Sequence, residues 1–492
     1  MIDQTLAELA HLVGGALHRA TGDERITGTV EFDSRAVGPG GLFVALPGER
    51  ADGHAFARTA LDAGAAGVLA AREVDGPAVV VPVGATPEGA GGSYVLAADR
   101  DGSGAAVLAA LQTLARHVVD TLVARTGLSV VGITGSSGKT STKDLVAALL
   151  ERDGPTVAPP GSFNNELGHP WTVLRADAGT RHLVCELSAR GPGHIAALCR
   201  VAPPRVGAVL NVGSAHLGEF GSREAIAAAK GELVEALPSA DRGGVAVLGA
   251  DDPVVAAMAD RTAARVVHAG RSPRAHVQAV DEALGDDGRA RFRLVTARGE
   301  AGVALRLRGA HQVDNALVAA AIALETTGLS VAAVAEALGE AEPRSRWRME
   351  VGERADGLTV LNDAYNANPE SMRAALTTLA AMAPGEGGHR TAVLGEMAEL
   401  GPDAEAAHAE LGRLAARTGL HRLVVVGEAA RGMHDAARDA GLASDLVPDA
   451  AAALEAVHAG PGDVVLVKAS RSAGLETVAQ ALLAGTGTGG PR

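Results

Sequence analysis

Apolar residues between positions 128 and 250 follow two alternating patterns. Short runs that are apolar throughout are typical of buried strands, and the segments between them carry apolar residues at helical spacing. Buried strands that alternate with helices predict a parallel sheet covered on both faces. The expected strands are 128–134, 182–187, 206–212 and 244–250, and the expected helices are 140–152, 193–201 and 223–237.

The pattern changes beyond this region. Residues 264–308 are richer in β signals, which predicts an antiparallel extension of the sheet, and residues 311–328 and 330–340 read as paired helices. A second alternating series begins after residue 346 and predicts a smaller Rossmann-like domain without a phosphate loop of its own. Its expected strands are 359–365, 391–397, 423–429 and 463–470.

The first hundred residues mix shorter elements, and a long helix expected over 103–126 leads onward. The chain therefore reads as an α/β protein of three domains: a small α/β domain (1–105), a central domain with a mainly parallel sheet (106–343) and a C-terminal Rossmann-like domain (344–492). The short elements expected near the start are strands 26–35, 40–46, 67–71 and 78–83 and a helix over 55–65.

Composition excludes several classes of function. Hydrophobic residues make up 47% and charged residues 21%, as in globular proteins, and the formal net charge of −14 argues against binding to nucleic acid. Two cysteines are too few for a disulfide scaffold and suit a reducing compartment. Neither a secretory signal nor a run of about 18 apolar residues is present, so we expect a cytoplasmic protein without a membrane span.

Lysine is scarce, with 4 residues against 40 arginines, and two of the four lie close together after the expected strand 128–134. The segment Gly135-Ser136-Ser137-Gly138-Lys139-Thr140-Ser141 has the short G-x-x-G-K-T form of a phosphate-binding loop between a strand and a helix. Backbone amides of such a loop wrap phosphate oxygens, the lysine reaches the β- and γ-phosphates, and the threonine binds Mg²⁺. We therefore expect ATP and Mg²⁺ here.

Glu186 closes the next expected strand, 182–187. A carboxylate at the carboxyl edge of a parallel sheet lies where ligands bind, and its oxygens suit a hard cation. Glu186 is thus a candidate ligand of Mg²⁺ beside the phosphates.

Further motifs extend along the chain. They include FDSRAVGPGG (32–41), FNNELGHP (163–170), NVGSAHLGEFGS (211–222), AIAAAKGEL (225–233), GAHQVDNALVAA (309–320), WRMEV (347–351), NDAYNANPES (362–371), LGEMAELG (394–401) and KASR (468–471). With the phosphate loop, this set resembles the Mur ligase family of ATP-dependent amide-forming enzymes over essentially the whole chain.

The resemblance implies roles for residues in the first two domains. Residues 1–105 would bind a UDP-linked substrate, with Ser34 and Arg35 at the nucleotide-sugar end. Asn164 and Asn165 would lie near the sugar, although two adjacent asparagines also suit a simple turn. His216 would join Thr140 and Glu186 at the metal site. Lys230 matches a lysine that is carbamoylated in the family and so becomes a further anionic metal ligand.

The resemblance also implies contacts with the nucleotide. Asn315 would lie near the adenine, and Arg348, Asp363 and Asn366 would meet ATP. The D-x-Y-N-A-N-P sequence within NDAYNANPES is typical of the branch of the family that adds D-alanyl-D-alanine to UDP-N-acetylmuramoyl-tripeptide. We therefore expect a monomeric ligase of peptidoglycan synthesis with these two small-molecule substrates.

Other readings stay open at this point. Another Mur-type or folylpolyglutamate-type ligase shares the phosphate loop, but NDAYNANP and the DSR segment argue against both. A P-loop motor or switch protein would hydrolyse ATP without small-molecule acceptors. A non-catalytic scaffold is disfavoured by the joint presence of Lys139, Glu186 and Lys230. The third residue of the peptide and the base for the incoming amine are not indicated by any motif.

Overall fold

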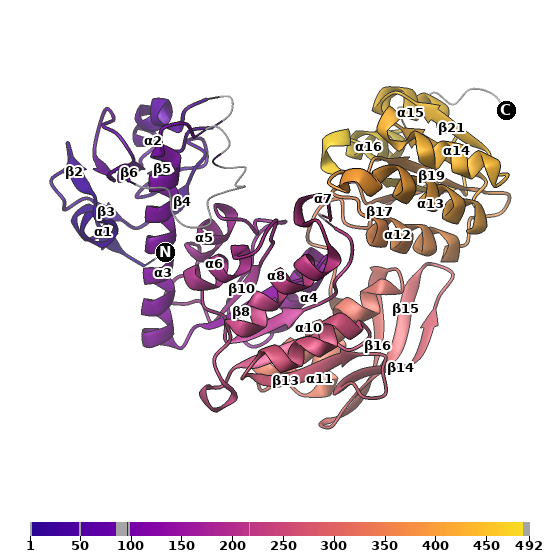
Figure 1. The fold of residues 1–492 in the computed structure, drawn as a ribbon, viewed down its shortest axis with the longest axis horizontal. Helices are drawn as coiled ribbons and strands as arrows, with labels where there is room; N and C mark the ends of the chain where they lie inside the picture. The colour runs from indigo at the N-terminus through magenta and orange to yellow at the C-terminus, as the bar shows by residue number, and fades with distance from the viewer. Residues whose placement is uncertain (1, 49–50, 85–95, 97–98, 216, 486–492) are drawn as a thin grey trace.

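The computed structural model describes residues 2–48, 51–84, 96, 99–215 and 217–485. Within these residues the chain forms three α/β units, each with its own main sheet of five, nine or six strands (Figure 1). The expected fold class is confirmed. The exact domain boundaries 1–105, 106–343 and 344–492 stay a prediction.

The N-terminal unit is a five-stranded sheet in the order β2-β7-β6-β5-β4, parallel except for the β2–β7 pair. Thr5 caps the first helix, and Glu8 completes a capping box, which fixes where that helix starts. The elements are β1 (Gln4–Thr5), α1 (Leu6–Val13), β2 (Ala16–His18), β3 (Arg25–Ile26), β4 (Val30–Glu31), β5 (Leu42–Val44), α2 (Ala57–Asp62), β6 (Gly67–Ala70) and β7 (Ala78–Val80).

The expected strand over 26–35 is wrong. It is split into β3, which pairs with β1, and β4, which belongs to the main sheet. Gly28 lies between them where the backbone passes so close that a Cβ would be 2.6 Å from the Pro39 carbonyl oxygen. After β4 the Asp33 side chain accepts from the Arg35 amide, and this turn ends the strand.

The central unit carries the order β16-β15-β14-β13-β12-β11-β8-β10-β9. Strands β9 to β14 are parallel with β8, and β15 and β16 form the expected antiparallel extension. The elements are α3 (Ser103–Thr126), β8 (Ser129–Thr134), α4 (Lys139–Leu150), β9 (Thr156–Val157), α5 (Gly168–Val173), β10 (His182–Glu186), α6 (His194–Val201), β11 (Val206–Val209), α7 (Leu217–Phe220), α8 (Arg223–Glu235), β12 (Val245–Gly249), α9 (Pro253–Ala256), β13 (Arg265–Gly270), β14 (Val277–Leu284), β15 (Arg289–Thr296), β16 (Gly299–Arg308), α10 (His311–Thr326) and α11 (Val331–Glu340).

The C-terminal unit has the order β17-β18-β22-β19-β20-β21, parallel except for the edge strand β17. Its four expected strands are present, and its edge strands β17 and β21 are additions to the prediction. The elements are β17 (Glu350–Glu353), β18 (Thr359–Asn362), α12 (Pro369–Ala381), β19 (Arg390–Gly395), the 3₁₀ turn η4 (Gly401–Asp403), α13 (Ala404–Arg417), β20 (Arg422–Val426), α14 (Arg431–Asp439), β21 (Ser444–Val447), α15 (Ala450–Ala456), β22 (Val464–Lys468) and α16 (Glu476–Ala484).

Helix α3 joins the first two units. It contacts α1 on one side and α5 and α6 on the other, and one apolar core runs through it from Leu6 to Leu183. By length and composition α3 could cross a membrane, but half of the relevant window is buried inside the protein, so it is a core helix. The two cysteines, Cys185 and Cys199, are free and buried in the same core.

Candidate active site

The phosphate loop lies between β8 and α4, as expected. Lys139 is the first residue of α4, and its Nζ donates to the Gly135 carbonyl oxygen at 2.7 Å. Gly138 has φ of 79°, and a Cβ there would lie 2.5 Å from the Asn315 Oδ1, so this position requires glycine. Helix α10 thus holds the side chain of Asn315 directly against the phosphate loop.

Asn211 organises the loop from the neighbouring strand. Its Oδ1 accepts from the amides of Ser136 at 3.1 Å and Ser137 at 2.9 Å, and its Nδ2 donates to the Ser137 carbonyl oxygen. Asn211 follows β11, which pairs with β8, so the two chain segments leave the same edge of the sheet. Sequence reasoning gave this residue no role, although it is one of only seven asparagines.

Glu186 ends β10 beside Ile133 of β8, which places its carboxylate at the carboxyl edge of the sheet. Its Oε1 accepts from the Asn164 Nδ2 at 2.6 Å, and its Oε2 is buried with no hydrogen-bond partner. Burial lowers the pKa of Lys139, while the negative charge of Glu186 opposes that shift. The loop therefore places the partly buried amine of Lys139 near a carboxylate oxygen of Glu186 that has no hydrogen-bond partner in the described part of the protein.

The oxygen atoms here suit a hard cation. The hydroxyl of Thr140 lies 2.8 Å from the Ser162 Oγ, and Thr140 and Glu186 both line the cleft. Over the described residues, no group of three or more His, Cys, Asp and Glu side chains forms a ready metal site. The predicted ligand His216 lies outside the described residues.

Lys230 is buried in α8 and does not line the cleft. Burial lowers its pKa well below the ordinary value for lysine, and the positive charge of Lys139 lowers it further. Lys230 therefore lies close enough to Lys139 for the two positive charges to repel each other, and its amine is shifted toward the neutral form.

The C-terminal unit supplies the opposite wall. Arg348 donates to the Ser162 Oγ at 2.9 Å, and its guanidinium lies 4.1 Å from the ring centroid of Tyr365. Asp363 accepts from the buried Nζ of Lys468 at 2.6 Å, and the same Nζ donates to the carbonyl oxygen of Asn366 at 2.7 Å. This network fixes the NDAYNANP segment at the cleft.

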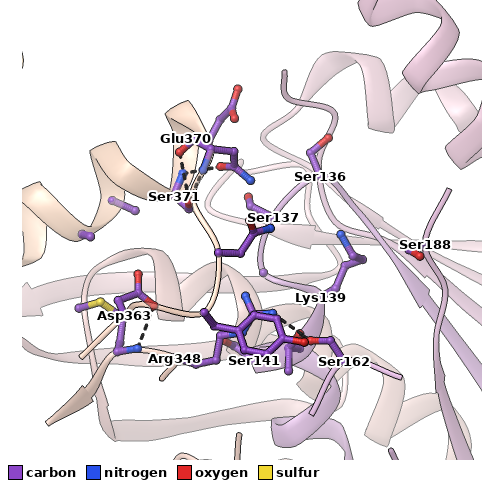
Figure 2. Close-up of a pocket in the computed structure, with 18 of the residues that line it drawn as sticks. Ser136, Ser137, Lys139, Ser141, Ser162, Ser188, Arg348, Asp363, Glu370 and Ser371 are labelled. Atoms are coloured by element: carbon purple, nitrogen blue, oxygen red, sulfur yellow. Dashed lines mark hydrogen bonds between the residues drawn. The ribbon is translucent and has the colours of Figure 1, made fainter. Parts of the chain in front are cut away.

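The cleft between the two walls has a volume of about 840 Å³, within the range of small-molecule sites. Figure 2 shows the loop residues Ser136, Ser137 and Lys139 facing Glu370 and Ser371 of α12 across it. Predicted residues that line it are Ser136, Ser137, Gly138, Lys139, Thr140, Ser141, Asn164, Glu186, Asn315, Arg348, Asp363 and Asn366.

Comparison with models of protein families identifies the family of the chain. Residues 27–98 match the model "Mur ligase family, catalytic domain", residues 133–323 match "Mur ligase middle domain", and residues 347–471 match "Mur ligase, glutamate ligase domain". The chain belongs to the Mur ligase family. It is an ATP-dependent ligase that forms an amide bond.

Individual relatives are similar over almost the whole chain. The UDP-N-acetylmuramoyl-tripeptide--D-alanyl-D-alanine ligase of Mycobacterium tuberculosis is 56% identical, with 98% of each chain covered. The ligase of the same name from Escherichia coli is 33% identical, with 98% of this chain and 99% of that one covered.

Solved structures agree with this likeness. A crystal structure of MurF from Acinetobacter baumannii superposes with a TM-score of 0.82 at 28% identity, covering 98% and 99% of the two chains. MurF ligase from Thermotoga maritima in complex with ADP gives a TM-score of 0.74 at 28% identity, covering 92% and 97%.

Some predicted site residues of this Mur ligase lie away from the cleft. Asn165 does not line it but accepts from the amide of Gly168 at 2.8 Å, the turn role that the sequence left open. Ser34 and Arg35 lie in the N-terminal unit, where the 86% exposed Arg35 pairs with Asp33 at 2.7 Å. That pairing lowers the pKa of Asp33 to about 2. The substrate roles of Ser34, Arg35 and Asn165 stay predictions.

Asn315 lines the cleft but already has partners. Its Oδ1 accepts from the Thr142 hydroxyl at 3.2 Å, and its Nδ2 donates to Gln312 at 2.9 Å. Its contact with adenine stays a prediction. Sequence reasoning also missed Ser162 and Glu370, which link the two walls, because no local pattern distinguishes them from ordinary turn and helix residues.

Proposed function

We propose that this Mur ligase joins D-alanyl-D-alanine to UDP-N-acetylmuramoyl-tripeptide in peptidoglycan precursor synthesis, with release of ADP and phosphate. The observation that carries the proposal is the 56% identity, over 98% of both chains, to a ligase of that name. The NDAYNANPES segment supports it, because Asp363 and Asn366 line the cleft opposite the phosphate loop.

The central problem of the reaction is electrostatic, since a carboxylate must approach ATP. The terminal carboxylate of the tripeptide attacks the γ-phosphorus, the bond to the β–γ bridging oxygen breaks, and ADP leaves. Lys139 and the loop amides neutralise the charge that spreads over the transferred phosphoryl group. The amine of D-alanyl-D-alanine then attacks the acyl carbon, loses a proton, and the tetrahedral intermediate expels phosphate.

Thr140, Glu186, His216 and a carbamoylated Lys230 would hold Mg²⁺. The cation would neutralise phosphate oxygens when bound. The free oxygen of Glu186 and the hydroxyl of Thr140 fit this role. Carbamoylation requires a neutral amine, and burial, which lowers the pKa of Lys230, favours that form.

The chain's own residues support cytoplasmic action on small molecules. The buried free thiols of Cys185 and Cys199 suit a reducing compartment, and the negative net charge disfavours nucleic acid as a partner. We propose a monomer that completes its site with its own C-terminal unit.

The test is phosphate release from ATP and Mg²⁺ with UDP-N-acetylmuramoyl-tripeptide, with and without D-alanyl-D-alanine. The expected result is release that depends on both substrates, with a product heavier by one dipeptide less water. Tripeptides ending in diaminopimelate or lysine, tested side by side, identify the accepted third residue. Release that ignores D-alanyl-D-alanine would instead favour another ligase of the family or an ATPase.

A further inference from the structure

Glu370 forms a contact between the C-terminal and central units that the reaction scheme above does not use. It lies in the first turn of α12, and its Oε1 accepts from both the amide and the hydroxyl of Ser214, each at 2.9 Å. A carboxylate that accepts two hydrogen bonds makes a stronger contact than a neutral acceptor would. Its position at the start of a helix also favours the negative charge.

The Glu370 side chain lies close against Gly213, the residue before Ser214. A Cβ on Gly213 would lie 2.6 Å from the Glu370 Cδ and 2.7 Å from its Oε1. The side chain of Glu370 therefore packs directly on the backbone of the segment after β11. This close approach explains why the sequence places glycine at a position whose φ is not in the left-handed region.

The same segment reaches the phosphate loop. The amide of Gly213 donates to the Ser136 Oγ at 2.8 Å, two residues after Asn211, which binds the amides of Ser136 and Ser137. A continuous chain of polar contacts thus runs from α12 of the C-terminal unit, through residues 211–214, to the loop that would hold ATP. We call residues 211–214 the docking segment.

A second contact lies next to the docking segment. The Gly218 amide of α7 donates to the Glu399 carbonyl oxygen at 3.2 Å, and α7 contacts the 3₁₀ turn η4. A Cβ on Gly218 would lie 2.8 Å from the Gly401 nitrogen. Figure 1 shows α7 beside the C-terminal unit, so the region after β11 meets that unit at two places.

The contact also has one unfavourable feature. The Glu370 Oε2 is buried without a hydrogen-bond partner. Burying an unpaired carboxylate oxygen costs free energy, which offsets part of what the two bonds of Oε1 contribute. Opening the cleft would return Oε2 to water and recover that cost.

We propose that Glu370 is a positioning residue that locks the C-terminal unit onto the docking segment and so sets the phosphate loop for phosphoryl transfer. The proposal rests on the proposed function, because it assigns Glu370 a part in the same ATP-dependent reaction. In this role Glu370 acts through Ser214, Gly213 and Asn211.

The test compares Glu370→Ala, Glu370→Gln and Ser214→Ala with Glu386→Ala, an exposed control in the same unit. Losing two charge-assisted bonds should lower kcat of Glu370→Ala about ten-fold or more, with KM for the tripeptide substrate unchanged. Glu370→Gln keeps an acceptor oxygen for Ser214 but loses the negative charge, so it should lose less activity than Glu370→Ala. Wild-type kcat in Glu370→Ala, or equal losses in the Ala and Gln variants, would overturn the proposal.

A double-mutant cycle tests whether Ser214 and Glu370 act through the same contact. Ser214→Ala combined with Glu370→Ala should be no worse than Glu370→Ala alone, because Glu370→Ala already removes the hydrogen bond that Ser214→Ala would lose. Gly213→Ala, which pushes Glu370 away, should likewise add little to Glu370→Ala. Multiplying effects would contradict the proposal. An inactive wild type would defeat the proposed function, whereas an active wild type with an equally active Glu370→Ala defeats only the lock.

Discussion

The central unit meets its two neighbours in different ways. Toward the N-terminal unit one apolar core is continuous, running from α1 and β6 through α3 into α6 and β11. Toward the C-terminal unit the cores are separate, since the two apolar clusters of residues 349–482 include no residue of the central sheet. There the contacts are polar, as between Arg348 and Ser162 or Glu370 and Ser214.

The difference has a physical consequence. Parting an apolar core exposes surface at a cost of about 25 cal/mol for each Å². Polar contacts, in contrast, exchange with water at a small net cost. The first boundary is therefore rigid, and the second can open and close around ATP and the acceptors. We call them the apolar boundary and the polar boundary.

Removing the amine of Lys230 should have the largest effect on activity. Lys230→Arg keeps a cation but cannot be carbamoylated, so we expect no detectable ligase activity. Short carboxylic acids should partly restore Lys230→Ala by supplying the missing anionic oxygen. Steady-state phosphate release is the measurement. An active arginine variant would refute the carbamate role.

Lys139→Ala should come next. Loss of the phosphate-facing ammonium should lower kcat by at least about 100-fold, comparable to losing one preorganised donor. The apolar boundary does not include Lys139, so circular dichroism should show the same fold. A kcat close to that of the wild type would remove the loop from the reaction.

Leu114→Ala tests the apolar boundary itself. Leu114 is fully buried in α3, and its truncation should cost about 2–5 kcal/mol of stability. Hydrogen exchange resolved by peptide should show faster opening in the N-terminal and central units together. Leu376→Ala, at a fully buried position of the C-terminal core, is the matched variant and should loosen only residues of that unit. Loosening of all three units by either variant would contradict the distinction.

His169 gives the apolar boundary a dependence on pH. It is buried in α5 and donates from Nε2 to the Leu198 carbonyl oxygen at 3.0 Å, and burial lowers its pKa from 6.5 to about 4. Between those values the unfolded chain holds a proton that the folded chain lacks, so stability falls as the pH falls.

From pH 7 to pH 5 this linkage should cost about 2 kcal/mol. His169→Gln should lose correspondingly less stability over that interval in denaturant titrations, and His458→Gln, at an exposed position, should behave like the wild type. Equal losses in the wild type and His169→Gln would show that His169 does not carry the effect.

Arg35→Ala should have the smallest effect, because the residue belongs to neither boundary. Its side chain is 86% exposed, so stability should not change. If it contacts the UDP end of the substrate, KM for that substrate should rise several-fold. Arg58→Ala removes a similar exposed arginine paired with Asp62 and is the control. An unchanged KM would remove Arg35 from the substrate site.

The local sequence pattern predicted the wall of the cleft that the central unit forms. The strand–loop–helix around Lys139 and the carboxylate of Glu186 follow from the order of strands in a parallel sheet, since neighbouring strands end at the same edge. The edge strands β17 and β21 were not predicted because they are short and only partly buried. The prediction of one strand over 26–35 was wrong because turn residues interrupt the apolar pattern of this segment.

The link between the two walls could not be predicted in this way. Ser214 and Glu370 lie 156 positions apart, one in the segment after β11 and the other in α12. Neither has a periodicity or motif that marks its partner. Contacts of this kind depend on how separately cored units dock, which no local pattern encodes.

The most direct test of the two boundaries is hydrogen exchange of the whole protein with and without ADP and Mg²⁺. We expect slower exchange on binding in residues 211–214, 344–349 and the start of α12, with no change in α3. Exchange in α3 that responds to the nucleotide as strongly as the polar boundary does would contradict it.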